Sequence, residues 1–553
     1  DHRDLHSFPT RRSSDLLSRG VLTHGDFAVH GAEKTGFVRL AIDPMKGDTS
    51  LVLDAIPQGW RVGDKLVLAG THRNEPATPA KGELYDSNFE DEELVITAIV
   101  GNTVYLDRPL QYNHETPRDD LKTYVANYTR NVRIETENAD SVPVHERGHV
   151  MFMHADTVDV RYAEFFELGR TDKSVRAFDV ENLDTVESDS NIKGRYALHI
   201  HRAGVSDADS PVMIVGNAVW GSPGWGFVHH DSHAILADNA AYKITGAAYV
   251  AELGTETGRW ANNISIHTSG VWTTVKEGDD VNSFDLGRDG TAFWFQSRMV
   301  DAVGNVAASA TGSGYVYMHR SPSDRAKIID PLNVAQNDKL RYLDKVFVDS
   351  PNISKFLDNE AFGTRGGLHV VKANTKQGHD VRSEIENFTA WETRFGIHLE
   401  YTSHYTLKNI DLISTDTGTF TGGSSVGIHI GTEMYDLVIV NANIDGYRYG
   451  VFTTKESLQN PVVTNFEHHF IDVYIANAKT AAWVGVAANE IQYGLDYANK
   501  DLTFDPGWSG ILEGLSYLDK LQFEIQGIKT DSLGQTAYSH SFDPAKITFR
   551  SLQ

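Results

Sequence analysis

Short β-prone runs recur along most of this chain, and many of them open near a glycine. The recurring runs are GHVMFMH (148–154), RYALHIH (195–201), GFVHHD (226–231), AAYVAE (247–252), TAFWFQ (291–296), GYVYMH (314–319), GLHVVK (367–372), FGIHLE (395–400), VGIHIG (426–431) and YGVFTT (449–454). Second runs such as MIVGNAVW and AILADNAAY lie between them. Two or three short strands in each repeat of roughly 22–30 residues predict a right-handed parallel β-helix over residues 126–480.

A different β pattern precedes this repeat. The segments SLVLDAI (50–56), KLVLAG (65–70), ELVITAIV (93–100) and TVYLDRPL (103–110) are β-rich, and the last two flank a Gly101-Asn102 turn that is typical of a hairpin. Residues 17–125 therefore predict a small all-β domain. After about residue 480 the repeat fades, and we expect 481–553 to form a C-terminal β extension or cap.

The first sixteen residues, DHRDLHSFPTRRSSDL, resemble the translation of a short-read sequencing adapter. We therefore treat residues 1–16 as an artefact and leave them out of the fold prediction. On this interpretation the native N-terminus, with any signal sequence, is missing, and the β domain at 17–125 is truncated at its start.

Composition narrows the function classes. The 553 residues carry a formal net charge of −25 and include no cysteine, which excludes disulfides, thiolate metal sites and a cysteine nucleophile. The acidic balance disfavours nucleic-acid partners. The sequence contains no run of 18 apolar residues, so it predicts no membrane span. These features are compatible with a secreted bacterial protein.

The repeats also align polar side chains into a stripe. Equivalent positions of successive coils lie about 4.8 Å apart, so a column in the alignment becomes a line on the surface. The last residues of the runs are His154, His201, His229 or His230, Glu252, Gln296 and His319. In Leu198-His199-Ile200-His201, alternation places both histidines on the outer face if Leu198 and Ile200 fill the bore. Such a stripe would floor an elongated groove suited to a polymer.

Three interpretations of the stripe remain open. In the first, Glu252 and a second carboxylate, either Glu256 or Asp231, form a glycosidase pair. In the second, a metal ion is held by His199, His201 and one of His229 and His230. In the third, stacking of the polar side chains only orders the solenoid. Trp225 and Tyr249 lie near the stripe and would stack on sugar rings, unless they only cover the flank of the helix or fill turns.

Several motifs then resemble a known family. GWRVGDKLVLAGT (59–71) and EELVITAIVGNTVYLDRPLQYNH (92–114) are similar to the eight-glycine domain that precedes a β-helix in the cell-migration-inducing hyaluronan-binding protein, its cell-surface hyaluronidase relative and fibrocystin-like proteins. GRYALHIHRAG (194–204), VHHDSHAILADNAAY (228–242) and GAAYVAELGTE (246–256) follow in the family's order. The chain departs from the animal members at Gly246-Ala247, where they have Gly-His, and in having no cysteine.

The resemblance implies an extracellular glycan-handling protein and points to His199, His201, His229, Glu252 and Glu256. We therefore predict a secreted, hyaluronidase-like glycoside hydrolase that degrades a polysaccharide. The expected catalytic residues are Glu252, Glu256 and His229, and the expected metal ligands for calcium or zinc are His199, His201 and His229. The expected substrate-binding residues are His199, His201, Arg202, His230, Trp225, Tyr249 and Gln296. The alternatives are a non-catalytic glycan-binding or adhesin segment of a larger surface protein, and a polysaccharide lyase.

Overall fold

The structure is a computed structural model of the chain. It describes residues 19–73, 84–85, 89–155, 157–175, 177, 191–204, 210–271, 287–318, 328–329, 340–344, 346–371, 379–415, 419–420, 423–453, 467–477, 480–484, 522–526 and 547–550. The adapter-like residues 1–16 and His319 lie outside these ranges.

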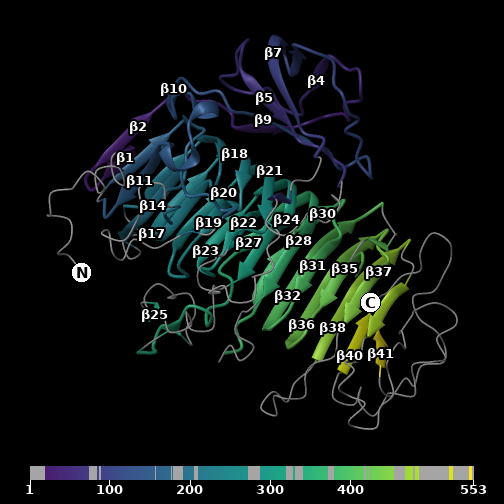
Figure 1. Cartoon of the computed structure of the whole chain (residues 1–553). Coiled ribbons are helices and arrows are strands. Elements are labelled where there is room, and N and C mark those ends of the chain that lie inside the picture. Colours follow the sequence, from purple (N-terminus) through teal and green to yellow (C-terminus); the bar gives the residue numbers. More distant parts are fainter. Residues whose placement is uncertain are drawn as a thin grey trace.

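Parallel strands stacked in successive coils form most of the molecule (Figure 1). One coil contains β14 (Leu198–Gly204), β15 (Val212–Val215) and β16 (Ala218–Ser222). In the next coil, β17 (Phe227–Ala237) pairs in parallel with both β14 and β15, and β18 (Ala240–Thr245) pairs with β16. Three strand positions per coil give three parallel sheets, which confirms the predicted parallel β-helix. Its handedness stays a prediction.

We name the sheets by the order in which the chain passes through them. Sheet 1 contains β1 (Gly20–Thr23), β11 (His149–Met153), β14, the first half of β17, β19 (Ala247–Ala251), β22 (Thr291–Phe295), the second halves of β24 (Val306–Met318) and β28 (Glu360–Val371), β31 (Phe395–Leu399), β35 (Val426–Ile430), β37 (Tyr449–Thr453) and β39 (Thr480–Val484).

Sheet 2 contains β2 (Phe27–His30), β12 (Val158–Arg161), β15, the second half of β17, β20 (Thr257–Ala261), β23 (Val300–Val303), β27 (Phe356–Leu357), β29 (Ser383–Glu386), the first halves of β32 (Thr402–Ile413), β36 (Met434–Asp445) and β38 (Glu467–Ala476), and then β40 (Gln522–Gln526) and β41 (Ile547–Arg550). The strands β40 and β41 continue the parallel stack beyond residue 480.

Sheet 3 contains β10 (Val132–Glu135), β13 (Ala163–Phe166), β16, β18, β21 (Ile264–Val271), the first halves of β24 and β28, β30 (Thr389–Trp391) and the second halves of β32, β36 and β38. The remaining short elements are β6 (Leu84–Tyr85), β25 (Ile328–Ile329), β26 (Val346–Phe347), β33 (Thr419–Phe420), β34 (Gly423–Ser424) and the 3₁₀ turns η1 (Ala139–Ser141) and η2 (Val144–Glu146).

A stack of aromatic rings fills the bore behind sheet 1. Phe227, Tyr249, Phe293 and Tyr315 lie on four consecutive coils, with successive ring centroids 4.8, 4.7 and 5.0 Å apart and nearly parallel planes. Offset stacking of this kind adds to the burial of large apolar area, so the stack holds the coils in register.

An asparagine ladder fixes the corner between sheets 2 and 3. Asn217, Asn239, Asn263, Asn305 and Asn359 are fully buried, and each of the last four accepts hydrogen bonds at Oδ1 from the asparagine one coil earlier. Residues just before the ladder, such as Asp238 and Asn262, have a left-handed backbone, with φ of 58° and 52°. Asparagine and aspartate tolerate this conformation, so the chain turns a corner within one residue.

The N-terminal region contains an antiparallel sheet of six strands in the order β3 (Phe37–Arg39), β9 (Tyr124–Asn127), β5 (Lys65–Leu68), β7 (Glu92–Val100), β8 (Thr103–Leu106) and β4 (Ser50–Val52). The predicted hairpin is confirmed, because Val100 pairs with Thr103 across the Gly101-Asn102 turn. The predicted start of this domain at residue 17 is wrong. Strands β1 and β2 pair in parallel with β11 and β12 and form the first rung of the solenoid.

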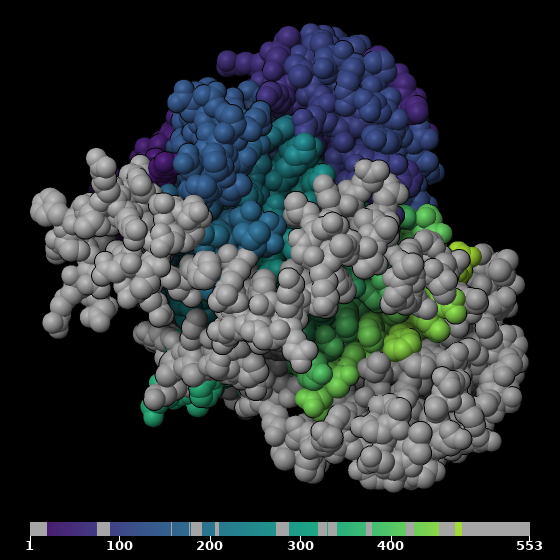
Figure 2. Space-filling model, viewed as in Figure 1, coloured from purple at the N-terminus to yellow at the C-terminus, as the bar shows by residue number. Residues whose placement is uncertain are grey.

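The antiparallel sheet packs on sheet 3. Tyr128 lies against Trp220 and Tyr242, with ring centroids 5.4 and 5.6 Å away. The space-filling view shows the two parts in direct contact (Figure 2). The antiparallel sheet therefore covers sheet 3 and not the outer face of sheet 1. Among the described residues, no helix is long and apolar enough to cross a membrane.

Candidate functional site

The strand register decides which side chains of sheet 1 point outward. His199 pairs with Met151 and Val228, whereas Ile200 pairs with Phe152 and His229. Phe152 and Ile200 belong to the core that fills the bore. The alternation predicted for Leu198–His201 is therefore confirmed, and His199 and His201 lie on the outer face. His230, paired with His201, lies on the same face one coil later.

These residues meet Glu252 in a compact group, which we call the first histidine cluster: His199, His201, His230 and Glu252. Nε2 of His199 lies 3.4 Å from Nδ1 of His201 and 3.6 Å from Oε2 of Glu252. The same Oε2 lies 2.9 Å from Nδ1 of His230. One nitrogen from each of the three histidines lies within 4.8 Å of the other two.

The spacing fits a shared ion. Ligand atoms on one tetrahedral ion lie about 3.3 Å apart when each bond to the metal is about 2.0–2.1 Å. Nδ1–H of His199 donates to the carbonyl of Gly194 at 2.9 Å, which leaves the lone pair of Nε2 directed at the cluster. Without an ion, the contact between His199 and His201 would be a long hydrogen bond.

Burial keeps His199 and His201 in their neutral form. Burial lowers the pKa of His199 to about 4, against the opposing effect of Glu252. Burial, with the neighbouring His199 and His230, lowers the pKa of His201 to about 2. A neutral imidazole is the form that binds a metal, so the cluster is prepared for one at neutral pH.

His229 does not join this cluster, and its predicted roles as metal ligand and catalytic residue are corrected. It is fully buried and pairs with Ile200 and Ala251 on the bore side. Its Nε2–H donates to the carbonyl of Ser232 at 2.6 Å. Adjacent strand residues face opposite sides, so His229 and His230 cannot both be outward, and the structure places His230 there.

Glu256 is also placed differently from its predicted role as a partner carboxylate. It is fully buried, and its carboxylate accepts the backbone N–H groups of Asp231, Leu253 and Gly254 at 3.0, 2.6 and 2.8 Å. Oxygens engaged in this way anchor the bend at Asp231 within β17 and the loop that carries Glu252. This geometry is that of a structural carboxylate.

The predicted aromatic platforms lie inside the protein. Tyr249 belongs to the bore stack, and its hydroxyl donates to the carbonyl of Ile264 at 3.1 Å. Trp225 is fully buried on the outer side of sheet 1, where Nε1–H donates to the carbonyl of Gly287 at 2.6 Å and the ammonium of Lys173 lies 3.4 Å from the ring centroid. Neither ring presents a face to solvent, so the predicted stacking on sugars is corrected.

The two remaining predicted binding residues flank the cluster. Gln296 is buried in the coil after Glu252 and donates from Nε2 to the carbonyl of Glu252. Arg202 is exposed, with a left-handed backbone at φ 56°, directly after His201. Of the two, only Arg202 is accessible for contact with a ligand.

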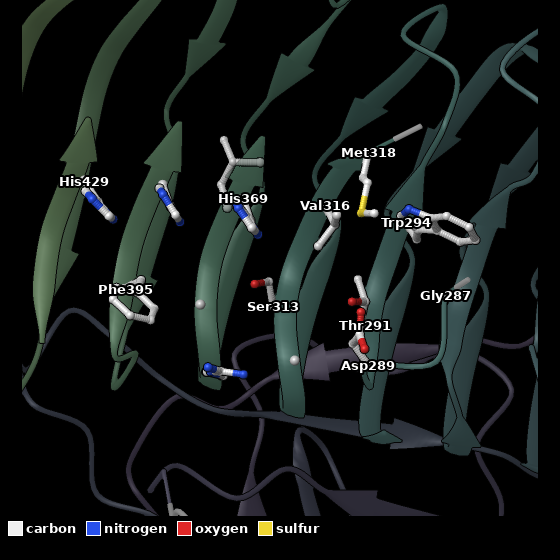
Figure 3. Close-up of a pocket in the computed structure, with 15 residues that line it drawn as sticks. Gly287, Asp289, Thr291, Trp294, Ser313, Val316, Met318, His369, Phe395 and His429 are labelled. Carbon is white, nitrogen blue, oxygen red and sulfur yellow. The ribbon is translucent and has the colours of Figure 1, made fainter. Parts of the chain in front are cut away.

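A pocket that the stripe did not predict lies farther along the same face. It has a volume of about 500 Å³, and its lining includes Asp289, Trp294, Arg365, His369, His398 and His429. Trp294, Val316 and His369 project from successive strands, and His429 continues the same row from the second strand after His369 (Figure 3). His199 pairs with Val228, Val228 with Val250, and Val250 with Trp294, so this row and His199 occupy the same position on successive strands.

Comparison with known sequences places the chain in a family setting. Residues 171–368 match the family model described as CEMIP beta-helix. Two G8 domain-containing proteins of Dictyostelium discoideum are 24% and 23% identical over 241 and 240 residues, or 43% of this chain. The matches cover only 18% and 14% of those two proteins. The chain is a relative of the CEMIP and G8 domain β-helix proteins, as the motifs predict.

Two solved structures to which the chain is similar are described as complexes with saccharides. The catalytic domain of a GH87 alpha-1,3-glucanase in complex with tetrasaccharides is 12% identical, with 95% of this chain and 99% of that chain covered and a TM-score of 0.34. The Gp54 tailspike of Acinetobacter baumannii bacteriophage AP22, in complex with a capsular saccharide, is 9% identical, with coverages of 96% and 67% and a TM-score of 0.24. The β-helix is assigned here from the chain's own strand pairing.

Proposed function

We propose that this protein is a polysaccharide hydrolase whose substrate lies along the outer face of sheet 1. One observation carries the proposal: the first histidine cluster and the pocket of about 500 Å³ lie on the same sheet face. Four strand steps separate His230 on β17 from His369 on β28, or about 19 Å at the usual strand spacing. An interaction face of that length suits a polymer better than a small molecule.

Glu252 is the proposed general acid or base. Its carboxylate lies at the outer edge of the cluster with a side-chain exposure of 12%, so a glycosidic oxygen can approach it. In hydrolysis, a protonated carboxyl donates its proton to the leaving oxygen, and water adds to the anomeric carbon. Asp231 is the proposed second carboxylate, because Glu256 is engaged by backbone groups. Asp231 is half-buried beside His230 and accepts a hydrogen bond from Thr255 at 2.6 Å.

The donor set indicates which metal the cluster prefers. Three imidazole nitrogens suit zinc and other first-row transition metals, whereas calcium takes oxygen ligands. Of the two metals that the sequence predicts, we therefore propose zinc, held by His199, His201 and His230. When bound, such an ion would polarise substrate or water at the edge of the groove.

The test is a polysaccharide panel that contains hyaluronan, other uronate polymers and neutral glucans. Wild type, Glu252→Gln and Glu256→Gln are incubated with each polymer after zinc loading or chelation, and product length is followed by gel or size-exclusion analysis. We expect wild type to shorten at least one polymer and Glu252→Gln to lose that activity by about 100-fold or more. Full activity of Glu252→Gln on a cleaved polymer would contradict the assignment.

A non-catalytic glycan-binding role is the second candidate, and the burial of the cluster favours it. His199 is 1% exposed and His230 is 9% exposed, as in a closed structural metal site. In that case no polymer is shortened, yet one is retained by the protein in affinity electrophoresis. A lyase would instead give products with the ultraviolet absorbance of an unsaturated uronate.

A further inference from the structure

A second group of histidines lines the pocket, and we call it the second histidine cluster: His369, His398, His429 and Glu400. The three histidines are direct register partners on β28, β31 and β35. Their rings are stacked, with centroids 4.5 and 4.1 Å apart and planes within 13° of parallel. Figure 3 shows His369 and His429 projecting from the strands on either side of β31 toward the same space.

Glu400 reaches back over two of these rings. Its Oε1 lies 3.2 Å from Nε2 of His369, and its Oε2 lies 3.8 Å from Nε2 of His398. One ligand atom from each of His369, His398 and Glu400 lies within 4.8 Å of the other two. Ligands of a tetrahedral ion with bonds of about 2.0–2.1 Å are about 3.3 Å apart, a spacing that lies between the two contacts of Glu400.

Several ring nitrogens here have no hydrogen-bond partner among the residues that the structure describes. Nε2 of His398 and both ring nitrogens of His429 are buried without a hydrogen bond to any described residue. A buried polar atom left in this state destabilises the fold, so a ligand for it is expected.

We propose that His369, His398 and Glu400 bind a second divalent first-row transition metal of the zinc class, with its open coordination position facing the pocket. Two imidazoles and one carboxylate form the donor set of metal sites that keep a position for water or substrate. The side chains of His369, His398 and Glu400 are 28%, 18% and 23% exposed, so the site opens to the pocket. The first histidine cluster is more buried, which distinguishes the two sites.

The test measures metal content of the full chain and does not depend on any activity. Wild type, His398→Ala, Glu400→Gln and His201→Ala are stripped with chelator, loaded with zinc, desalted and analysed by inductively coupled plasma mass spectrometry. We expect His398→Ala and Glu400→Gln each to bind one equivalent of zinc fewer than wild type. Loading with Co²⁺ provides a spectroscopic check, because its visible absorption reports nitrogen and oxygen ligands in the site.

A matched control removes a histidine elsewhere. His30 on β2 is exposed and pairs only with Asp159 among the described residues, at 3.0 Å, so His30→Ala is expected to keep the wild-type zinc content. Circular dichroism identifies any variant that fails to fold, and Glu400→Gln, which preserves side-chain shape, then decides the question. Equal zinc content in wild type and folded Glu400→Gln would overturn the second site, whatever the result for His201→Ala.

Discussion

Nδ1 of His230 lies 2.9 Å from Oε2 of Glu252, although 22 residues separate them in the sequence. The two residues are neighbours because β17 and β19 pair in parallel and the chain completes one coil between them. The same carboxylate oxygen is 3.6 Å from Nε2 of His199. Glu252 thus serves as the carboxylate partner of His230, an arrangement that orients a histidine ligand.

This arrangement predicts opposite outcomes for two histidines that are close in sequence. His201→Ala removes an outward ligand, and we expect zinc affinity at the first cluster to fall by at least about 100-fold, with little change in stability. His229→Ala leaves a cavity in the bore, and we expect it to lower the free energy of unfolding by about 2–4 kcal/mol while zinc is still bound. Zinc titration against a competing chelator and urea unfolding measure the two quantities. Loss of zinc by a folded His229→Ala protein would reverse the assignment.

The choice between His229 and His230 shows what the sequence could decide. In Leu198-His199-Ile200-His201 the apolar and polar residues alternate, and only one register buries the apolar pair. In Phe227-Val228-His229-His230 both alternating sets contain one apolar residue and one histidine, so alternation cannot choose between them. The bore stack decides which histidine faces inward. Phe227 stacks on Tyr249 in the bore, and His229, two residues later on the strand, faces the same side.

The second histidine cluster had a signal in the sequence. GLHVV, GIHLE and GIHIG each place histidine third in a run that begins with glycine, and the structure pairs these three histidines directly. Trp225 and Tyr249 were harder to place, because an aromatic residue near a strand fits the bore, the flank or a platform equally well. The pocket depends on how the segments around Gly287–Thr291 and Gly312–Ser313 approach the sheet, which hydrophobic periodicity does not encode.

Glu256 tests whether a buried carboxylate acts on substrate or on the fold. Its carboxylate holds three backbone N–H groups, so Glu256→Gln, which keeps the shape and removes the charge, is expected to lower stability by about 1–3 kcal/mol. The turnover of the remaining folded protein should change far less than in Glu252→Gln. Thermal unfolding and initial rates measured together decide this. A large loss of turnover with an unchanged melting temperature would restore Glu256 as a catalytic residue.

Substitutions of Tyr249 distinguish a ring that packs in the bore from a ring that stacks on a sugar. Tyr249→Phe keeps both ring contacts and loses only the hydrogen bond to Ile264, so a loss of about 1 kcal/mol in unfolding free energy is expected. Tyr249→Ala removes the ring between Phe227 and Phe293, and a loss of about 3–5 kcal/mol is expected. Urea unfolding gives both values. Weaker glycan retention by Tyr249→Ala with unchanged stability would mean that the ring contacts a ligand.

Alanine substitution in the asparagine ladder should lower the free energy of unfolding more than substitution of isolated asparagines on the outer surface. The Asn263 amide bonds both neighbours in the ladder and the carbonyl of Leu236, all in a buried corner. Asn263→Ala leaves those buried groups without partners, so we expect a loss of about 2–4 kcal/mol. The matched control is Asn443→Ala, whose half-buried side chain donates to Asp411 at 2.8 Å. Its expected cost is below about 1 kcal/mol, and equal costs at both positions would contradict the role of the ladder.

The antiparallel sheet contains a carboxylate that should make stability depend on pH. Glu92 is 1% exposed, and its carboxylate accepts the backbone N–H groups of Gln111 and Tyr112 and contacts Arg108 and His114 at 2.6 and 3.3 Å. Burial alone would raise the pKa of Glu92, but the hydrogen bonds from His114, Arg108 and the two backbone groups outweigh it and lower the pKa to about 2.

A carboxylate whose pKa is lower in the folded state stabilises the fold above the pKa of the unfolded chain. Its contribution is therefore complete above about pH 4.5 and is lost as the pH falls through about 2. We expect Glu92→Gln to cost about 2 kcal/mol near neutral pH, and the difference from wild type to shrink across that interval. Urea unfolding of both proteins at several pH values measures the difference, in which carboxylates common to both cancel. A difference that stays constant down to pH 2 would show that Glu92 acts through packing, and a difference that grows on acidification would contradict the sign of the pKa shift.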